Sequence, residues 1–552
     1  MSRPPFQIPR PFLKSCQQHD LYPTKLVDRT RYGFPLLQLY QNRFKERQRE
    51  LGLFVPAERL FVPYWDVSKD GQVDQRNLKT EEELSQWLGD ECLDTQGIGS
   101  GQAQIVSPKP DPQCRFIFLA TASSVDPLEI TPDALKRVLS YYQVMPCFPD
   151  FLYTFGAKNG DDREITRFSG FRTEKTFRNA NAAMEIPALN RSGKTYQLCY
   201  TLKSVSLKPV TDGHLDPIIN KAWRIRSAVI YHRFDIEYGT QLWIIGDPLE
   251  GIHEVVQEHI HEKKIHSARF GTTAQSFNTS LEMVLHYAQW ATEEWRWHVQ
   301  SSEDILEKIT QHYAVVGPGP VEWDQSGLMV IQERERYLTN TITCLESNIA
   351  VMSRLKSFYT SLIEDPAWPQ SDVAAVGRAV GEFAVQLDEY VYDISGQLKR
   401  ANLALQTAKD RKENLLHNLN AQNAARQERY TKIMYEQQHK TGLDAIVMKV
   451  ITVVTLIYLP MTFVSTFFST DVVKYQPDPD PGPSSSSSTA SGTGPILPAE
   501  GNESFSSLAL QRFFTISIPL MVLTFVLAYG WYWWESRRIK KNAQRHGKDL
   551  IV

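Results

Sequence analysis

Two long apolar runs near the C-terminal end dominate the pattern of hydrophobic and polar positions. The first extends from Ile446 to Phe468, the second from Phe513 to Trp534, and a polar stretch separates them. As an α-helix, the first run is about 34 Å long at about 1.5 Å per residue, which is enough to cross the hydrocarbon core of a bilayer. The sequence therefore predicts a multi-pass membrane protein with two C-terminal transmembrane helices.

Ahead of these runs, residues 1–270 alternate between charged helical patterns and short runs typical of strands. The last two strand-like runs, 228–234 and 241–245, are separated by the turn-like segment Asp235–Gly239, so they are predicted to pair antiparallel. The alternation predicts an α/β domain. Further helices are predicted over 36–50, 80–88 and 132–142, and further strands over 114–121 and 195–202.

From about residue 275 the pattern becomes helical. Helices are predicted over 281–299 and 328–363. No proline interrupts residues 371–459, so one long stalk helix, or two nearly collinear ones, is expected to continue into the first span. Residues 418–429 are polar nearly all round, which is typical of a helix that neighbours stabilise or that water surrounds.

Basic residues flank the two spans unevenly, and this asymmetry predicts the orientation. The only basic residues between the spans are Lys474 and Arg512. Lys432, Lys440 and Lys449 lie before or at the start of the first span, and six basic residues follow the second. The positive-inside rule then places both termini in the cytosol and the loop outside. Asn502, in a sequon within that loop, is the candidate glycosylation site. All six cysteines precede the first span without a CxxC pair, which is typical of reduced thiols in a cytosolic domain.

These patterns divide the chain into six parts. They are a cytosolic α/β domain (1–270), a helical region with the stalk helix (271–445), transmembrane helix 1 (446–468), an external Pro/Ser-rich loop (469–512), transmembrane helix 2 (513–534) and a basic cytosolic tail (535–552).

One face of the first span carries a stripe of threonines. Met448, Thr452, Thr455, Leu459, Thr462 and Thr466 are spaced by three or four residues, which places them on one side of a helix. Polar residues within a membrane usually face protein or water, so the stripe predicts a pore wall. In the alternative, the threonine hydroxyls bond to their own helix or pack against the second span. Pro460 removes a backbone donor in mid-span and predicts a bend there.

No catalytic constellation accompanies these elements. Asp66–Asn77 resembles an EF-hand loop but ends in asparagine instead of the bidentate glutamate, which favours a solvated turn. The histidines between 253 and 266 lack zinc-protease spacing, because Gln257 stands where the second histidine is needed. We therefore expect no enzyme activity and no resident cofactor. A net charge of −3 also indicates no nucleic-acid partner.

The segment Val447–Phe463 (VMKVITVVTLIYLPMTF) resembles the first transmembrane helix of the CorA family of pentameric magnesium and divalent-cation channels. Trp223–Ile245 and Glu293–Val299 are similar to the fungal CorA-like transporter domain. The resemblance implies a CorA-like fold and places Met448, Ile451, Leu459 and Thr462 on the pore wall. Where the family carries Gly-Met-Asn after this helix, the chain has Ser469-Thr470-Asp471.

The resemblance implies an oligomeric membrane channel or transporter for divalent metal cations, with Mg²⁺ as one candidate. Its partners are then the lipid bilayer, further copies of itself in a homopentamer, and the transported cation. The pore-lining candidates are Met448, Ile451, Thr455, Leu459, Thr462 and Thr466; Ser469, Thr470 and Asp471 form the filter, and Asp471 is the metal ligand. Because the filter triplet departs from the family pattern, the alternative is a non-conducting membrane-anchored sensor or scaffold.

Overall fold

The computed structural model describes most of the 552 residues. The ranges outside the description are 1–7, 28–31, 51, 91, 94–103, 106–108, 125, 157–165, 178–183, 208–222, 249–251, 255, 258–268, 315–324, 370–372, 470–506 and 547–552.

A mixed seven-stranded sheet forms the centre of the N-terminal domain. Its strand order is β2-β1-β5-β9-β8-β7-β6, and every neighbouring pair is antiparallel except β5 with β9. The predicted hairpin is confirmed, because β8 and β9 pair antiparallel. The bounds are β1 (Val62–Val67), β2 (Val73–Leu78), β5 (Cys114–Thr121), β6 (Phe171–Lys175), β7 (Thr195–Leu207), β8 (Trp223–Asp235) and β9 (Gln241–Pro248), with β3 (Cys92–Leu93) and β4 (Gln104–Ile105) forming a separate pair.

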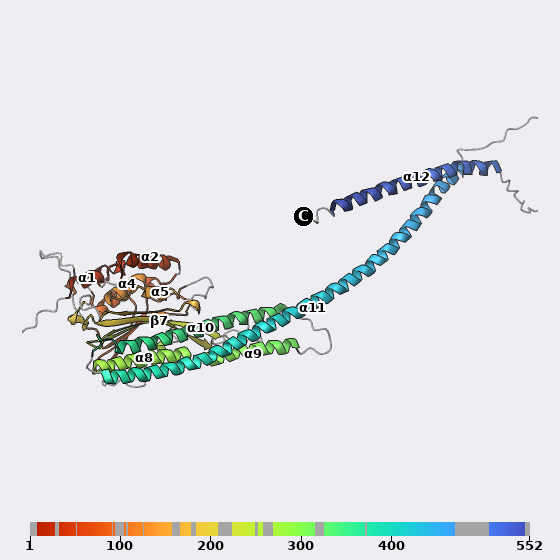
Figure 1. Cartoon of the computed structure of the whole chain (residues 1–552). Helices are drawn as coiled ribbons and strands as arrows, with labels where there is room; N and C mark the ends of the chain where they lie inside the picture. Colours follow the sequence, from red (N-terminus) through yellow and green to blue (C-terminus); the bar gives the residue numbers. More distant parts are fainter. Residues whose placement is uncertain are drawn as a thin grey trace, which may run out of the picture. The chain divides into compact units, whose positions relative to one another are not determined.

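Helices cover both faces of this sheet (Figure 1). Successive strand residues point to opposite faces, so Ile117 packs with Phe12 and Leu135 on one side, whereas Phe116 packs with Phe277 on the other. The first side carries α1 (Arg10–Gln17), α2 (Phe34–Glu50), α3 (Glu81–Leu88), α4 (Pro132–Tyr141) and α5 (Phe148–Leu152). The second carries α8 (Thr273–Thr292), α9 (Trp295–Ala314), α10 (Gln325–Ile363) and the first part of α11 (Val373–Ser469).

The helix predicted over 281–299 is two helices. α8 ends at Thr292 and α9 begins at Trp295. Between them Glu294 has a φ of 66°, a left-handed conformation that ends a helix. The break buries Trp295 completely, and its indole nitrogen donates to the carbonyl of Ala291 at 2.9 Å. Burial of this large side chain favours the turn over a continuous helix.

The first part of α11 packs through a seven-residue repeat. Its buried positions include Val380, Leu387, Ile394, Ala401, Ala408 and Leu415, each seven residues after the one before. A strict heptad is the pattern of a coiled-coil seam, in which one stripe faces a partner helix. Tyr359 of α10 contacts Phe383 of α11 on this seam, with ring centroids 5.1 Å apart. The stalk helix is thus anchored to the sheet domain along its first part.

The chain forms two compact units, Met1–Asn420 and Ala421–Val552. α11 begins in the first and ends in the second, which also contains α12 (Ser507–His546). Both helices contain segments apolar and long enough to cross a membrane, within Ala374–Thr466 and at Gln511–Trp531. The apolar windows of these segments are almost entirely exposed within the chain. The fold is therefore an α/β domain followed by long helices, two of them with membrane-spanning character.

Candidate functional site

The predicted pore face lies on α11 in the second unit. Met448, Ile451 and Leu459 are all more than half exposed within the chain. Thr455, Thr462 and Thr466 are exposed as well. At about 100° per residue these positions share one side of the helix. The buried positions Pro460 and Val464 lie on the other side, so the candidate face is left uncovered by the chain itself.

Each threonine hydroxyl on this face bonds to its own helix. Thr455, Thr462 and Thr466 donate to the carbonyls four residues earlier, at 2.8, 2.9 and 2.7 Å. The back-bonding of the alternative therefore occurs, and these residues are exposed within the chain. A hydroxyl that donates still has acceptor lone pairs. The face thus combines apolar side chains with uncharged oxygen atoms, a surface that can border water.

Pro460 lies inside α11, next to Leu459 on the exposed face. Proline has no amide hydrogen, so the carbonyl of Leu456 loses its usual helical donor. Such interruptions are tolerated in membrane helices where neighbouring groups satisfy the freed carbonyl. The position is thus a local weak point in the hydrogen-bond ladder, beside Leu459, the most exposed of the three apolar side chains of the face.

The filter residues are only partly described. Ser469 is exposed and its hydroxyl donates to the carbonyl of Thr466 at 3.0 Å. Thr470, Asp471 and the sequon residue Asn502 lie outside the described residues. Within the described part of the chain, no group of three or more His, Cys, Asp or Glu could hold a metal ion. The role of Asp471 as a metal ligand therefore stays a prediction.

A row of mostly polar side chains crosses the sheet, with Leu242 of β9 between Arg115 and Arg233, and it was not predicted from the sequence. Arg233 on β8 lies opposite Gln197 on β7, and Gln197 lies opposite Glu174 on β6. On the same face Arg115 of β5 donates to Asp66 of β1, with Nε 2.6 Å from the carboxylate. The sequence signal for this row is a charged residue inside a largely apolar run, such as Arg115 in β5 and Arg233 in β8.

Two guanidinium groups share one buried carboxylate beside this row. Arg191 holds Asp111 through two hydrogen bonds, of 2.6 and 3.1 Å, and Arg233 approaches it at 3.6 Å. Burial by itself raises the pKa of Asp111, but Arg191 and then Arg233 outweigh it, so that pKa lies below its usual value. Burial lowers the pKa of Arg233, and the charge of Arg191 lowers it further.

Comparison with known proteins then decides the family. A family model for CorA-like transporters matches residues 14–314, more than half of the chain. The chain belongs to the CorA-like transporter family. The match spans the sheet and the helices α8 and α9, and the two apolar helices follow it.

Two solved structures are similar to this CorA-like chain. Full-length CmaX is 11% identical, with 85% of this chain and 98% of CmaX covered and a TM-score of 0.29. The cytoplasmic domain of ZntB from Vibrio parahaemolyticus RIMD 2210633 is 10% identical, covers 64% and 99%, and gives a TM-score of 0.31. At these scores no residue role is transferred from either structure. A comparison with curated proteins finds no match.

Family membership supports a general function in divalent-cation transport and a location in a membrane. It also supports a transporter over an enzyme.

Proposed function

We propose that this CorA-like protein is a homopentameric channel for divalent cations, with Mg²⁺ as the first candidate. The observation that carries the proposal is the uncovered face of α11, Met448 to Ser469, on a helix of membrane-spanning character. In a closed cyclic assembly, symmetry brings the same face of every copy around one axis. The apolar surface of α12 and the other sides of the 446–468 segment of α11 then contact lipid.

The chemistry of the face suits a hydrated ion better than a bare one. Its described side chains carry hydroxyl and apolar groups without a formal charge, so they replace few of the waters around Mg²⁺. Mg²⁺ gives up water reluctantly and usually keeps several of its ligands. Leu459 then supplies an apolar ring that closes the path by dewetting. Selection among ions falls to the mouth at Ser469, Thr470 and Asp471.

The direct test is flux through the full-length chain in liposomes that contain a magnesium-sensitive dye. The channel proposal expects a Mg²⁺-dependent signal that protein-free liposomes do not give. The alternative, a non-conducting sensor or scaffold, is favoured by the Ser-Thr-Asp triplet, and it expects no flux from a correctly assembled oligomer. A stable monomer in mild detergent would contradict any central pore.

Leu459→Ala is expected to raise the leak of the closed state several-fold. Truncating an apolar ring widens the constriction and lowers the cost of keeping it wet. The magnesium-sensitive dye measures the leak as the slow rise of its signal after Mg²⁺ is added outside the liposomes. Val453→Ala is the matched control, because it lies on the other side of the same helix and is also exposed. An unchanged leak in an assembled, conducting Leu459→Ala protein would place the constriction elsewhere.

The proposed topology has both termini in the cytosol and the 469–512 loop outside. Charge asymmetry supports it, since basic residues gather before the first span and after the second, whereas the loop between the spans has few. After expression in a eukaryotic host, endoglycosidase should therefore shift the wild type but not Asn502→Gln. Asn190→Gln and Asn278→Gln are the controls, because both sequons lie in the sheet domain and its helices. If either control substitution removed a glycan, the sheet domain would lie on the external side and the proposed topology would be wrong.

A further inference from the structure

Three buried sulfur atoms meet between the sheet and the turn that joins α4 to α5. Met145 and Cys147 belong to this turn, and Cys199 belongs to β7. The Sγ atom of Cys199 lies 3.5 Å from the Sδ atom of Met145. The Cys147 thiol forms a hydrogen bond with Cys199. Cys199 therefore contacts a second thiol and a thioether at the same time.

The sulfur cluster is shielded from bulk water. Cys199 is completely buried, and Met145 and Cys147 are 2% and 7% exposed. Tyr231 of β8 lies opposite Cys199 in the strand register, and its ring packs against Phe148 with the ring centroids 5.3 Å apart. A hydrophobic shell of this kind limits the access of solvent to a bound metal ion.

Both segments that carry the sulfur atoms are held by other bonds. The backbone amide of Met145 donates to the side-chain oxygen of Gln197 at 3.0 Å, and the Tyr22 hydroxyl donates to the Met145 carbonyl at 3.1 Å. Gln197 lies two residues before Cys199 on β7, so their side chains share one face of the strand. β7 is itself paired on both sides, with β6 and β8. A ligand thus meets a preformed site and loses little affinity to ordering of the protein.

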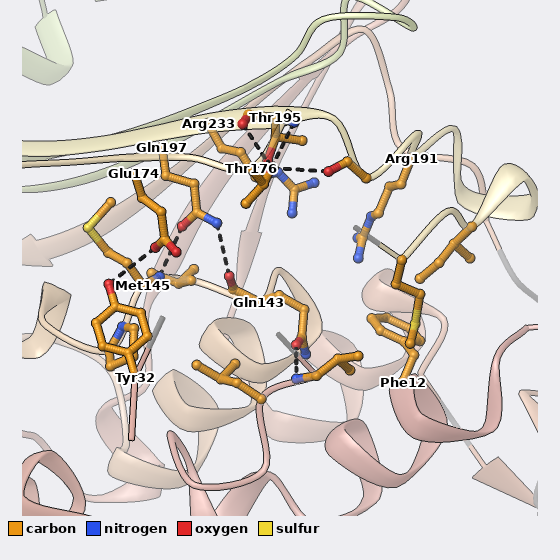
Figure 2. Close-up of a pocket in the computed structure, with 17 residues that line it drawn as sticks. Phe12, Tyr32, Gln143, Met145, Glu174, Thr176, Arg191, Thr195, Gln197 and Arg233 are labelled. Carbon is orange, nitrogen blue, oxygen red and sulfur yellow. Dashed lines mark hydrogen bonds between the residues drawn. The ribbon is translucent and has the colours of Figure 1, made fainter. Parts of the chain in front are cut away.

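A cavity of about 100 Å³ gives access to the sulfur cluster. Figure 2 shows Met145 at one end of this cavity, next to Gln197 and Glu174. The described lining of the cavity includes Met145 but neither cysteine. An ion that enters the cavity therefore meets the thioether before it reaches the two thiols.

The type and number of the ligands select the metal. Thiolate and thioether sulfurs are soft ligands, which suit Cu(I), Zn²⁺ and iron–sulfur clusters, whereas Mg²⁺ takes oxygen ligands. A structural Zn²⁺ site has four ligands, and an iron–sulfur cluster is usually held by four cysteines. Among the described residues, no His, Asp or Glu completes a group of three with the two cysteines. Two thiols and one thioether therefore suit a three-coordinate Cu(I) ion.

The spacing of the sulfur atoms is close to the spacing that such an ion requires. With metal–sulfur bonds of about 2.3 Å, a planar three-coordinate site places its sulfur atoms about 4 Å apart. The 3.5 Å between Met145 and Cys199 then has to open by about half an ångström. Methionine has three rotatable bonds, so its side chain can make this small movement without a change in the backbone.

The thiols change their protonation when a metal binds. Burial raises the pKa of the Cys199 thiol well above its usual value, and the hydrogen bond with Cys147 raises it further. Arg172, opposite Cys199 on β6, acts in the other direction. Asp150 raises this pKa slightly and is itself paired with Arg43 at 2.6 Å. Without a metal Cys199 keeps its proton, whereas a thiol that coordinates a metal loses it. Cu(I) binding therefore releases protons and transfers no electron.

We propose that Met145, Cys147 and Cys199 form a binding site for one Cu(I) ion. The ion connects the turn between α4 and α5 to the central sheet. All three residues belong to the first unit, so the CorA-like spans take no part in the site. Its soft ligands also differ from the hydroxyl and apolar groups of the proposed path for divalent cations. The site stands whether or not the chain conducts ions.

Competition with bathocuproine disulfonate, a chelator that forms a coloured Cu(I) complex, tests the site on the full-length chain in detergent without oxygen. The wild type is expected to hold one Cu(I) ion per chain. Cys147→Ser and Cys199→Ser should each weaken binding about 100-fold or more, since loss of even an outer-shell partner of a metal ligand costs about 10–100-fold. Cys344→Ser is the matched control, because Cys344 is completely buried on the other face of the sheet. Unchanged binding in Cys199→Ser, or an equal loss in Cys344→Ser, would overturn the assignment.

Met145→Leu tests the thioether separately. Exchange of methionine for leucine conserves volume and is well tolerated in a core, so this variant remains informative even if a cysteine variant fails to fold. It should weaken Cu(I) binding by about tenfold. X-ray absorption at the copper edge should find three sulfur ligands in the wild type and two in Met145→Leu. Nitrogen or oxygen ligands in the wild type, or a third sulfur that persists in Met145→Leu, would contradict the proposed ligands.

Discussion

Asp111→Asn is expected to destabilise the sheet domain by about 3–5 kcal/mol, the usual cost of removing one partner from a buried ion pair. The substitution leaves Arg191 and Arg233 facing each other without their shared counter-charge. All three side chains are at most 9% exposed, so water compensates little. The loss exceeds that of a surface pair because two desolvated cations are affected at once.

Denaturant unfolding of the full-length chain in detergent, followed by tryptophan fluorescence, measures this loss. Trp243 and Trp295 are completely buried in the domain and report its unfolding. Asp133→Asn is the matched control, because Asp133 pairs with Lys136 at 3.2 Å but is 65% exposed, and such pairs contribute little. Equal midpoints for the two variants would show that the Asp111 cluster does not stabilise the domain.

The Asp111 cluster also makes the stability of the sheet domain depend on pH. The folded-state pKa of Asp111 lies below its usual value, so the unfolded chain binds its proton first. The contribution is therefore complete well above the unfolded pKa of about 3.9 and disappears as pH falls through the lower folded value. The difference between wild type and Asp111→Asn should then be constant near neutral pH and shrink below about pH 4.

The elements whose patterns are local could be predicted from the sequence. The run 114–121 forms the predicted strand, because short and mostly apolar runs favour strands, and in the structure all eight of its residues are buried. The hairpin of β8 and β9 followed from a short turn between two such runs. The absence of proline from residues 371–459 predicts one long helix or two nearly collinear ones, and the structure has one, from Val373 to Ser469.

The polar row required information that no local pattern contains. Glu174, Gln197 and Arg233 are 23 and 36 residues apart in the chain, and only the strand register brings them together. Likewise, Asp111 precedes its strand and meets Arg191 through the fold alone. The break at Glu294 also depends on tertiary burial of Trp295. Helix periodicity continues through that point, so the sequence favours a continuous helix.

The candidate pore face could be predicted from the sequence only in part. Its residues share one side of α11 because helix geometry is local, and the structure adds that this side is uncovered. Which copies surround it depends on assembly, which a single chain does not contain. Thr470 and Asp471 of the filter lie outside the described residues, so their role stays a prediction from the family pattern.

Asp471→Asn is expected to lower divalent flux about tenfold, the lower end of what electrostatic focusing contributes to ion capture. In the proposed pentamer, symmetry places five Asp471 carboxylates around the axis at the outer mouth. Such a ring concentrates cations and offers hard oxygen ligands to hydrated Mg²⁺. The substitution restores the asparagine that the CorA pattern carries at this position. Because asparagine has nearly the shape of aspartate without its charge, the variant tests the charge of the side chain alone.

The ring also predicts an acid dependence that the variant lacks. Five carboxylates around one axis repel each other, so they take up protons in coupled steps, and mild acid weakens cation capture. Flux of Mg²⁺ in matched liposomes, measured between about pH 5 and 7.5, should therefore fall with acid in the wild type and stay level in Asp471→Asn. Asp444→Asn is the control, since it makes the same change before the other end of the span. Identical flux and identical acid dependence in wild type and Asp471→Asn would mean that Asp471 only marks the end of the helix, because a charged ring at the mouth of a conducting pore cannot be neutralised without changing what enters it.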